Sequence, residues 1–440
     1  MDCALYGPAQ VHGRSGDAHA SRERGAVSAF RSRGAGGRLT YAPRGACRHA
    51  FADWQSIWRA PYRPLFFLAG LWALAAPMVW LLAEETAPGR IAGHSRELLF
   101  GMAGAAAGGY LLTALPAWTS RGPVAPAVTV AAAGLWCLGR LTVLFAEHLP
   151  VLAAEVGACA YFAFLTAILA HGVLSAEAWY RYWAPLATAA LGINAALGEG
   201  VRSTGATPLL YVVLVVLVGG RAVPALTRHW LERTGRLKPF RDRPTLSHLA
   251  ILGILAAIHL GGVHQHAASG LALIFSGMLL MLQMATWQTL RTRRYPALFM
   301  LHIAFAWTPA ALGLNGLSAL FPEQISPGAA LHALTMGAMG TMISAFMMRS
   351  AMAREGERLI VSRVMAGAFA LVSLSALLRV LDGWLEDAHF DPVPAAAVLW
   401  IAAWALFLVA YIPAMRGPVP RPVFSAAIRN RSQAPPDGHG

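Results

Sequence analysis

Histidines in or beside long apolar runs are the residues of this sequence best suited to chemistry. His302 and His332 lie inside such runs, and His94 precedes one, with Glu97 three residues further along the chain. Ionisable groups at membrane depth mark functional sites by default. Neutral imidazole binds both haem iron and copper. These three histidines are therefore candidate ligands, and a structural hydrogen bond is the alternative role for each of them.

Glu97 has two possible roles at the start of its apolar run. A carboxylate in the first turn stabilises a helix through the helix dipole, by about 0.3–1 kcal/mol. The carboxylate could instead orient the imidazole of His94, which lies one helical turn away. Arg96 lies between the two and could pair with Glu97, contact a haem propionate or reach the membrane interface.

The composition predicts a membrane protein. The chain has 440 residues, of which 57% are hydrophobic and only 13% charged, whereas soluble domains carry about 25% charged residues. The formal net charge of +14 does not indicate nucleic-acid binding, because the basic residues lie between the apolar runs. In that position they orient a chain in the bilayer.

The elements that position the candidate ligands are predicted to be about twelve transmembrane helices, which makes the fold all-α. A run of roughly 20 apolar residues spans the hydrocarbon core, and in lipid such runs form helices. The predicted spans are 63–83, 97–117, 124–145, 150–174, 182–198, 206–226, 246–263, 270–290, 297–320, 328–350, 360–381 and 395–415.

The connections between these spans predict the orientation of the chain. Arginines fill connections 227–245, 291–296 and 349–363, while the connections AEHLP, FPEQISP and DGWLEDAHFDPVP on the opposite side contain acidic residues and no Lys or Arg. By the positive-inside rule both termini are then cytoplasmic. This orientation places His94 and His332 near the outer face. His302 lies about two turns from the cytoplasmic face, which predicts a separate site or a hydrogen bond for it.

The two ends of the chain differ from the apolar region. Residues 1–50 are rich in Gly, Ala, Ser and Arg without apolar periodicity, which predicts a disordered basic arm. Residues 51–422 form the predicted transmembrane domain, and residues 423–440 form a predicted tail.

Several motifs in order resemble the NnrS family of bacterial membrane proteins. His94 and Glu97 match the start of its second span, and the end of that span matches in Leu112, Thr113, Ala114, Pro116, Trp118 and Thr119. Further matches are GGRAVPALTR at 219–228, TRRYPALFMLHIAFAW at 292–307 and LHALTMGAMGTM at 331–342. The resemblance runs from residue 54 to about residue 420.

The resemblance implies a twelve-span protein of the bacterial inner membrane that contains haem and copper and acts in the response to nitric oxide. It implies no particular enzymatic activity. His94, Glu97, His302 and His332 are the predicted cofactor-binding residues, and His94 and His332 the predicted metal ligands. Arg96 stands where the family has a second histidine, and AREGER replaces a His-Thr-Gly after residue 350. Either one metal site has been lost, or those histidines are not ligands.

Two other functional classes share the twelve-span pattern. A secondary transporter would use buried charges at the membrane midplane, and Arg140 and Arg379 are candidates unless each pairs with a carboxylate. A haem–copper oxidase or nitric oxide reductase subunit would need several histidine ligands, including a neighbouring pair, and the sequence has no His-His.

Overall fold

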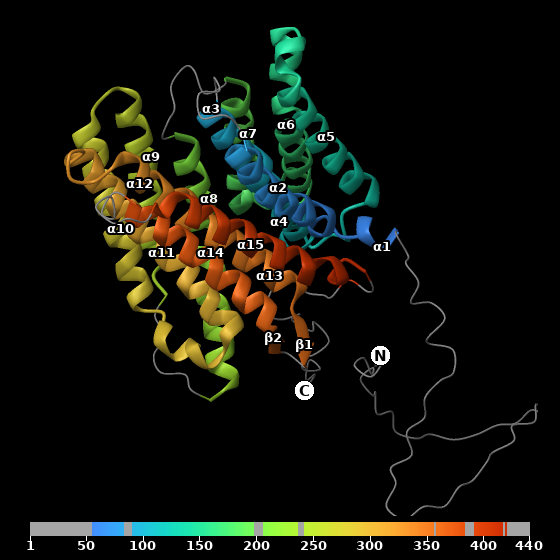
Figure 1. The fold of residues 1–440 in the computed structure, drawn as a ribbon. Coiled ribbons are helices and arrows are strands. Elements are labelled where there is room, and N and C mark those ends of the chain that lie inside the picture. Colours follow the sequence, from blue (N-terminus) through green and yellow to red (C-terminus); the bar gives the residue numbers. More distant parts are fainter. Residues whose placement is uncertain are drawn as a thin grey trace, which may run out of the picture. The chain divides into compact units, whose positions relative to one another are not determined.

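A computed structural model describes residues 55–82, 90–197, 206–235, 242–355, 358–382, 391–416 and 419. The predicted N-terminal arm and C-terminal tail lie outside these residues. The described part is helical except for one short hairpin, so the all-α prediction is confirmed (Figure 1). Its first half contains α1 (Gln55–Trp58), α2 (Tyr62–Leu82), α3 (Arg90–Arg96), the π-helix η1 (Glu97–Ala103), α4 (Gly104–Thr119), α5 (Pro126–Leu144), η2 (Ala146–His148), α6 (Val151–Ser175), η3 (Trp179–Arg181), α7 (Trp183–Leu197) and α8 (Ala206–Arg233).

The second half begins with α9 and ends with α15. It contains α9 (Pro244–Gly262), α10 (His266–Ala285), η4 (Thr289–Arg294), α11 (Pro296–Leu320), α12 (Pro327–His332), the π-helix η5 (Ala333–Gly340), α13 (Thr341–Ala351), β1 (Ala353–Glu355), β2 (Arg358–Ile360), α14 (Arg363–Leu381) and α15 (Pro392–Ala414). The antiparallel strands pair Ala353 with Ile360 and lie within the arginine-rich connection predicted at 349–363.

Eleven helices among the described residues are long and apolar enough to span a membrane. They coincide with eleven of the twelve predicted spans, and two of them, 93–119 and 327–351, each contain a π-helical segment. The remaining prediction, 182–198, corresponds to α7, which has 15 residues. At about 1.5 Å per residue α7 is roughly 22 Å long, which is shorter than a hydrocarbon core of roughly 30 Å.

Small residues allow these helices to pack closely. A Cβ atom on Gly270 of α10 would lie 2.7 Å from the carbonyl oxygen of Gly316 on α11, so the two backbones are in direct contact there. In η5, Gly337 faces the ring of Trp307, and Gly340 faces the ring of Trp400. The glycines in this span therefore fit against aromatic rings.

The first and last long helices are neighbours. In Figure 1, α2 lies beside α15. Trp400 Nε1 of α15 donates to the Ala73 carbonyl at 2.9 Å, and Tyr411 Oη donates to the Tyr62 carbonyl at 2.9 Å. These long-range bonds hold α2 in place, and α2 in turn packs against η1 and α4.

Candidate functional site

His332 ends α12 and has one ring nitrogen in use. Its Nδ1 lies 2.7 Å from the carbonyl oxygen of Gly328. A carbonyl oxygen can only accept a hydrogen bond, so Nδ1 carries the proton. In a neutral ring Nε2 then has an unprotonated lone pair, and the structure gives Nε2 no hydrogen-bond partner. This is the tautomer that binds a metal ion, and a carbonyl on the opposite nitrogen fixes the ring orientation.

The short helix that carries His332 is held by its neighbours. Asn315 of α11 donates through Nδ2 to the Ala330 carbonyl at 2.6 Å, and α12 packs against both α11 and α14. On α14, Arg379 forms an ion pair with Asp382 and lies close enough to His332 for their charges to interact. The helix that carries the His332 imidazole is therefore held by its neighbours, and the nearby Arg379 is already paired with a carboxylate.

The π-helix η5 begins at the residue after His332. A π-helical turn widens the helix by one residue and is often found at functional sites. Thr341 Oγ1 donates to the Gly337 carbonyl at 2.5 Å, which satisfies one backbone group of the widened segment. The wide turns therefore lie directly beside the candidate ligand.

His94 lies on α3, and two residues separate it from the other π-helix, η1. The side chain of His94 is half-buried. Glu97 is the first residue of η1. Its Oε2 accepts from Trp72 Nε1 of α2 at 2.5 Å, and its Oε1 pairs with Arg140 Nη1 of α5 at 3.0 Å. The side chain of Arg140 is 6% exposed and that of Glu97 20%, so this ion pair is largely shielded from the surroundings.

Arg140 is thus a cation that pairs with Glu97. One carboxylate oxygen of Glu97 contacts Trp72 and the other contacts Arg140. The predicted roles of Glu97 in orienting His94 and in cofactor binding stay predictions. The other arginine considered as an unpaired charge, Arg379, also has a carboxylate partner.

Three aromatic side chains donate to carbonyls in and just after η1. Tyr211 Oη of α8 reaches Leu99, Trp136 Nε1 of α5 reaches Gly101, and Tyr161 Oη of α6 reaches Gly104, at 2.7, 2.9 and 3.2 Å. A π-helix displaces the carbonyls from the usual α-helical pattern, and these donors stabilise the displaced groups. The segment is thereby anchored to three neighbouring helices.

Gly101 makes room for the Trp72–Glu97 bond. A Cβ at this position would lie 2.5 Å from Trp72 Nε1 and 3.4 Å from Glu97 Oε2. Real Cβ atoms do not approach so closely, so any larger residue would push the indole away from the carboxylate.

His302 differs from His332 because both of its nitrogens have partners. Thr227 Oγ1 lies 2.8 Å from Nε2, and Thr289 Oγ1 lies 3.0 Å from Nδ1. The Thr227 hydroxyl donates its one proton to the Val223 carbonyl at 2.7 Å, so it accepts from Nε2–H. Thr289 then donates to Nδ1. The ring is fully buried and packs edge-on against Trp287, which is the arrangement of a structural histidine.

The structure brings no larger set of ligands together. Among the described residues, no group of three or more His, Cys, Asp or Glu side chains could hold a metal ion. His94 belongs to the α2–α3–η1 group and His332 to the α11–α12–α14 group. His171, His259, His264 and His266 are all exposed. His332 keeps one ring nitrogen available to a ligand.

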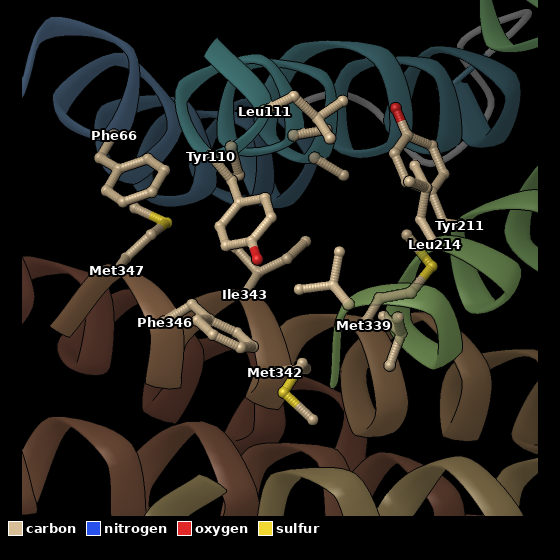
Figure 2. Close-up of a pocket in the computed structure, with 15 residues that line it drawn as sticks. Phe66, Tyr110, Leu111, Tyr211, Leu214, Met339, Met342, Ile343, Phe346 and Met347 are labelled. Atoms are coloured by element: carbon tan, nitrogen blue, oxygen red, sulfur yellow. The ribbon is translucent and has the colours of Figure 1, made fainter. Parts of the chain in front are cut away.

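An apolar pocket lies between α4, α8 and the η5–α13 span. Figure 2 shows side chains that line it, among them Tyr110, Leu214, Met339 and Met342, and Ala107 and Val218 also line the pocket. The pocket contains about 570 Å³ of empty space, part of it open to the surroundings. Almost all of its wall is apolar, so the pocket suits an apolar occupant.

Some of these contacts could have been found from the sequence. Arg140 and Glu97 both lie toward the outer ends of adjacent predicted spans, and a buried carboxylate needs a cation. The threonine partners of His302 and the aromatic donors to η1 have no comparable signal, because they come from distant positions in the chain.

A comparison with known protein families matches residues 56–418 to the family described as NnrS protein. No curated protein matches this chain.

Proposed function

From its membership of the NnrS family, to which this chain belongs, we propose that it is a haem- and copper-containing membrane protein that acts in the response to nitric oxide and in tolerance of nitrosative stress. His332 would hold the haem through its Nε2 atom. One observation carries the assignment: the Gly328 carbonyl holds the ring in the tautomer whose Nε2 lone pair is available.

The described side chains are better suited to hold a haem than a metal ion whose ligands are all protein side chains. A haem iron needs one or two axial ligands, because the porphyrin supplies the others, and His332 can provide one. A copper site normally takes three or more side chains, and the described residues contain no such group. The proposal that the protein contains copper therefore rests on its family membership, and His94 is the proposed copper ligand.

The proposed location is the bacterial inner membrane, with both termini in the cytoplasm. The arginine-rich connections support this orientation. Nitric oxide is a small apolar gas that concentrates in the bilayer, and a ferrous haem binds it. In this chain Gly328 orients the imidazole of His332, and the surrounding helices limit the access of water. His332 then lies near the outer face and His302 near the inner one.

The test is an optical spectrum and a metal analysis of the full-length protein, expressed in haem-replete cells and purified in detergent. We expect a Soret band, a shift of that band when nitric oxide is added to the reduced protein, and copper in the metal analysis. A protein without a Soret band would contradict the proposal and favour a transporter. The pairing of Arg140 and Arg379 with carboxylates argues against that alternative, because their charges are not free for a substrate.

A further inference from the structure

The helix faces that line the apolar pocket continue toward a pair of arginines. On α8, the pocket residues Leu214 and Val218 are followed at helical spacing by Arg221. On α4, the pocket residue Leu111 is followed two turns later by Trp118. Residues at these spacings share one side of a helix. Arg221 and Trp118 therefore lie beyond the same end of the pocket.

Arg181 connects these two positions. It ends η3, between α6 and α7, and its guanidinium lies 5.1 Å from the centre of the Trp118 ring and 4.8 Å from that of Tyr180. It is also close enough to interact electrostatically with Tyr110, which lines the pocket, and with Arg221. Two cations thus lie near each other at the end of an apolar space.

Among the described residues, no carboxylate forms an ion pair with Arg181 or Arg221. Two nearby donors are also buried without an acceptor, Arg181 Nε and Trp183 Nε1. Buried donors without partners are rare in proteins. Together with the two like charges, these donors favour the binding of an anion.

We propose that this is a binding site for an anionic phospholipid, with the phosphate between Arg181 and Arg221 and one acyl chain in the pocket. The pocket lies among membrane-spanning helices, and its methionines can adapt to a flexible chain. Trp179 and Tyr180 are 61% and 63% exposed, as expected for aromatic residues at the level of the headgroups. Basic pockets between transmembrane helices bind anionic headgroups.

The test measures lipid binding to the purified full-length protein in detergent. Palmitoyl-oleoyl phosphatidylglycerol is titrated against phosphatidylcholine with the same chains, and bound lipid is counted by native mass spectrometry. We expect tighter binding of phosphatidylglycerol.

Arg221→Gln should weaken that binding roughly fivefold, which corresponds to one arginine near an anionic surface. Arg181→Gln should have a similar effect. The matched control is Arg293→Gln, an exposed arginine on η4, which should bind like the wild type.

Two further arms separate the headgroup from the acyl chain. Inorganic phosphate at the same free concentration should not displace the lipid, because it lacks the chain. Ala107→Phe, which fills the pocket, should weaken the binding of phosphatidylglycerol. Because Arg221 is exposed, its glutamine variant should fold, and thermal unfolding in phosphatidylcholine checks this. Equal binding of the two lipids, no difference between Arg221→Gln and Arg293→Gln, or displacement by phosphate alone would each overturn the proposal.

Discussion

His332 and His302 lie in neighbouring spans, yet their hydrogen bonds differ. Each Thr–His302 contact uses one ring nitrogen, so the imidazole is satisfied on both sides. His332 uses only Nδ1 and leaves the lone pair of Nε2 available. Burial alone therefore does not identify a ligand. The number of nitrogens that the protein itself occupies separates a structural histidine from one that can bind a metal.

The same criterion applies to the carboxylate at the other π-helix. Trp72 and Arg140 each bind one carboxylate oxygen of Glu97. Like the two ring nitrogens of His302, both polar atoms of this side chain therefore have partners, whereas only one ring nitrogen of His332 does. His332 thus has a ring nitrogen available for a ligand, whereas the Glu97 carboxylate has a partner on each oxygen. The predictions below test this contrast between open and closed polar groups.

The largest expected effect is the loss of haem from His332→Ala. Because Nε2 is the proposed axial ligand, its removal should abolish the Soret band of protein purified from haem-replete cells. The comparison variant is His302→Ala, which removes a satisfied histidine and should retain the haem spectrum. The measurement is the ratio of Soret absorbance to protein absorbance for both variants. If His302→Ala loses haem and His332→Ala keeps it, the contrast is reversed and the assignment is wrong.

The next largest effect is expected from Arg140→Ala. This change leaves the Glu97 carboxylate shielded without its cation, and breaking a buried ion pair in this way destabilises a protein by about 3–5 kcal/mol. The measurement is denaturant unfolding of the purified protein in one detergent. The control is the double variant Glu97→Gln with Arg140→Met, which removes both charges and should recover much of the stability. A double variant no more stable than Arg140→Ala would show that the charge pairing is not the cause.

A smaller loss of stability is expected from Thr289→Val. The variant removes the donor to Nδ1 of His302 and leaves that buried nitrogen unsatisfied, at a cost of about 1–3 kcal/mol. Thr289→Ser keeps the hydroxyl and is the matched control. The free energy of unfolding should fall for the valine variant only, and the haem spectrum should be unchanged in both. Equal stability of the two variants would mean that the hydroxyl is not the donor to Nδ1.

The sequence predicted the spans well because their length and apolar character are local properties. Eleven predicted segments coincide with membrane-length helices. α7 differs because its helix has only 15 residues, although the apolar run suggested a full span. The π-helices were not predicted. A wide turn in η1 depends on donors such as Tyr211, which lies 112 residues from its acceptor, Leu99.

The candidate site was predictable as a set of residues but not as a set of contacts. His332 and Glu97 stood out because ionisable groups are rare in apolar runs. The choice of partner was not local: Glu97 binds Arg140, 43 residues away. His302 binds Thr227, 75 residues away. Only the packed helices show which polar groups are satisfied and which remain open.

The smallest expected effect is that of Asp382→Asn. The Arg379–Asp382 pair lies close to His332, but its side chains are 22% and 28% exposed, and ion pairs of this kind contribute about 0–1 kcal/mol. The imidazole is oriented by the Gly328 carbonyl, not by Asp382. Haem affinity should therefore change far less than the roughly 10–100-fold seen when a metal-bound histidine loses its hydrogen-bond partner. Haem titration of the apoprotein measures this, with Asp391→Asn, at the start of α15, as the matched charge control. A loss of tenfold or more in Asp382→Asn alone would make this carboxylate, rather than the backbone, the group that orients His332.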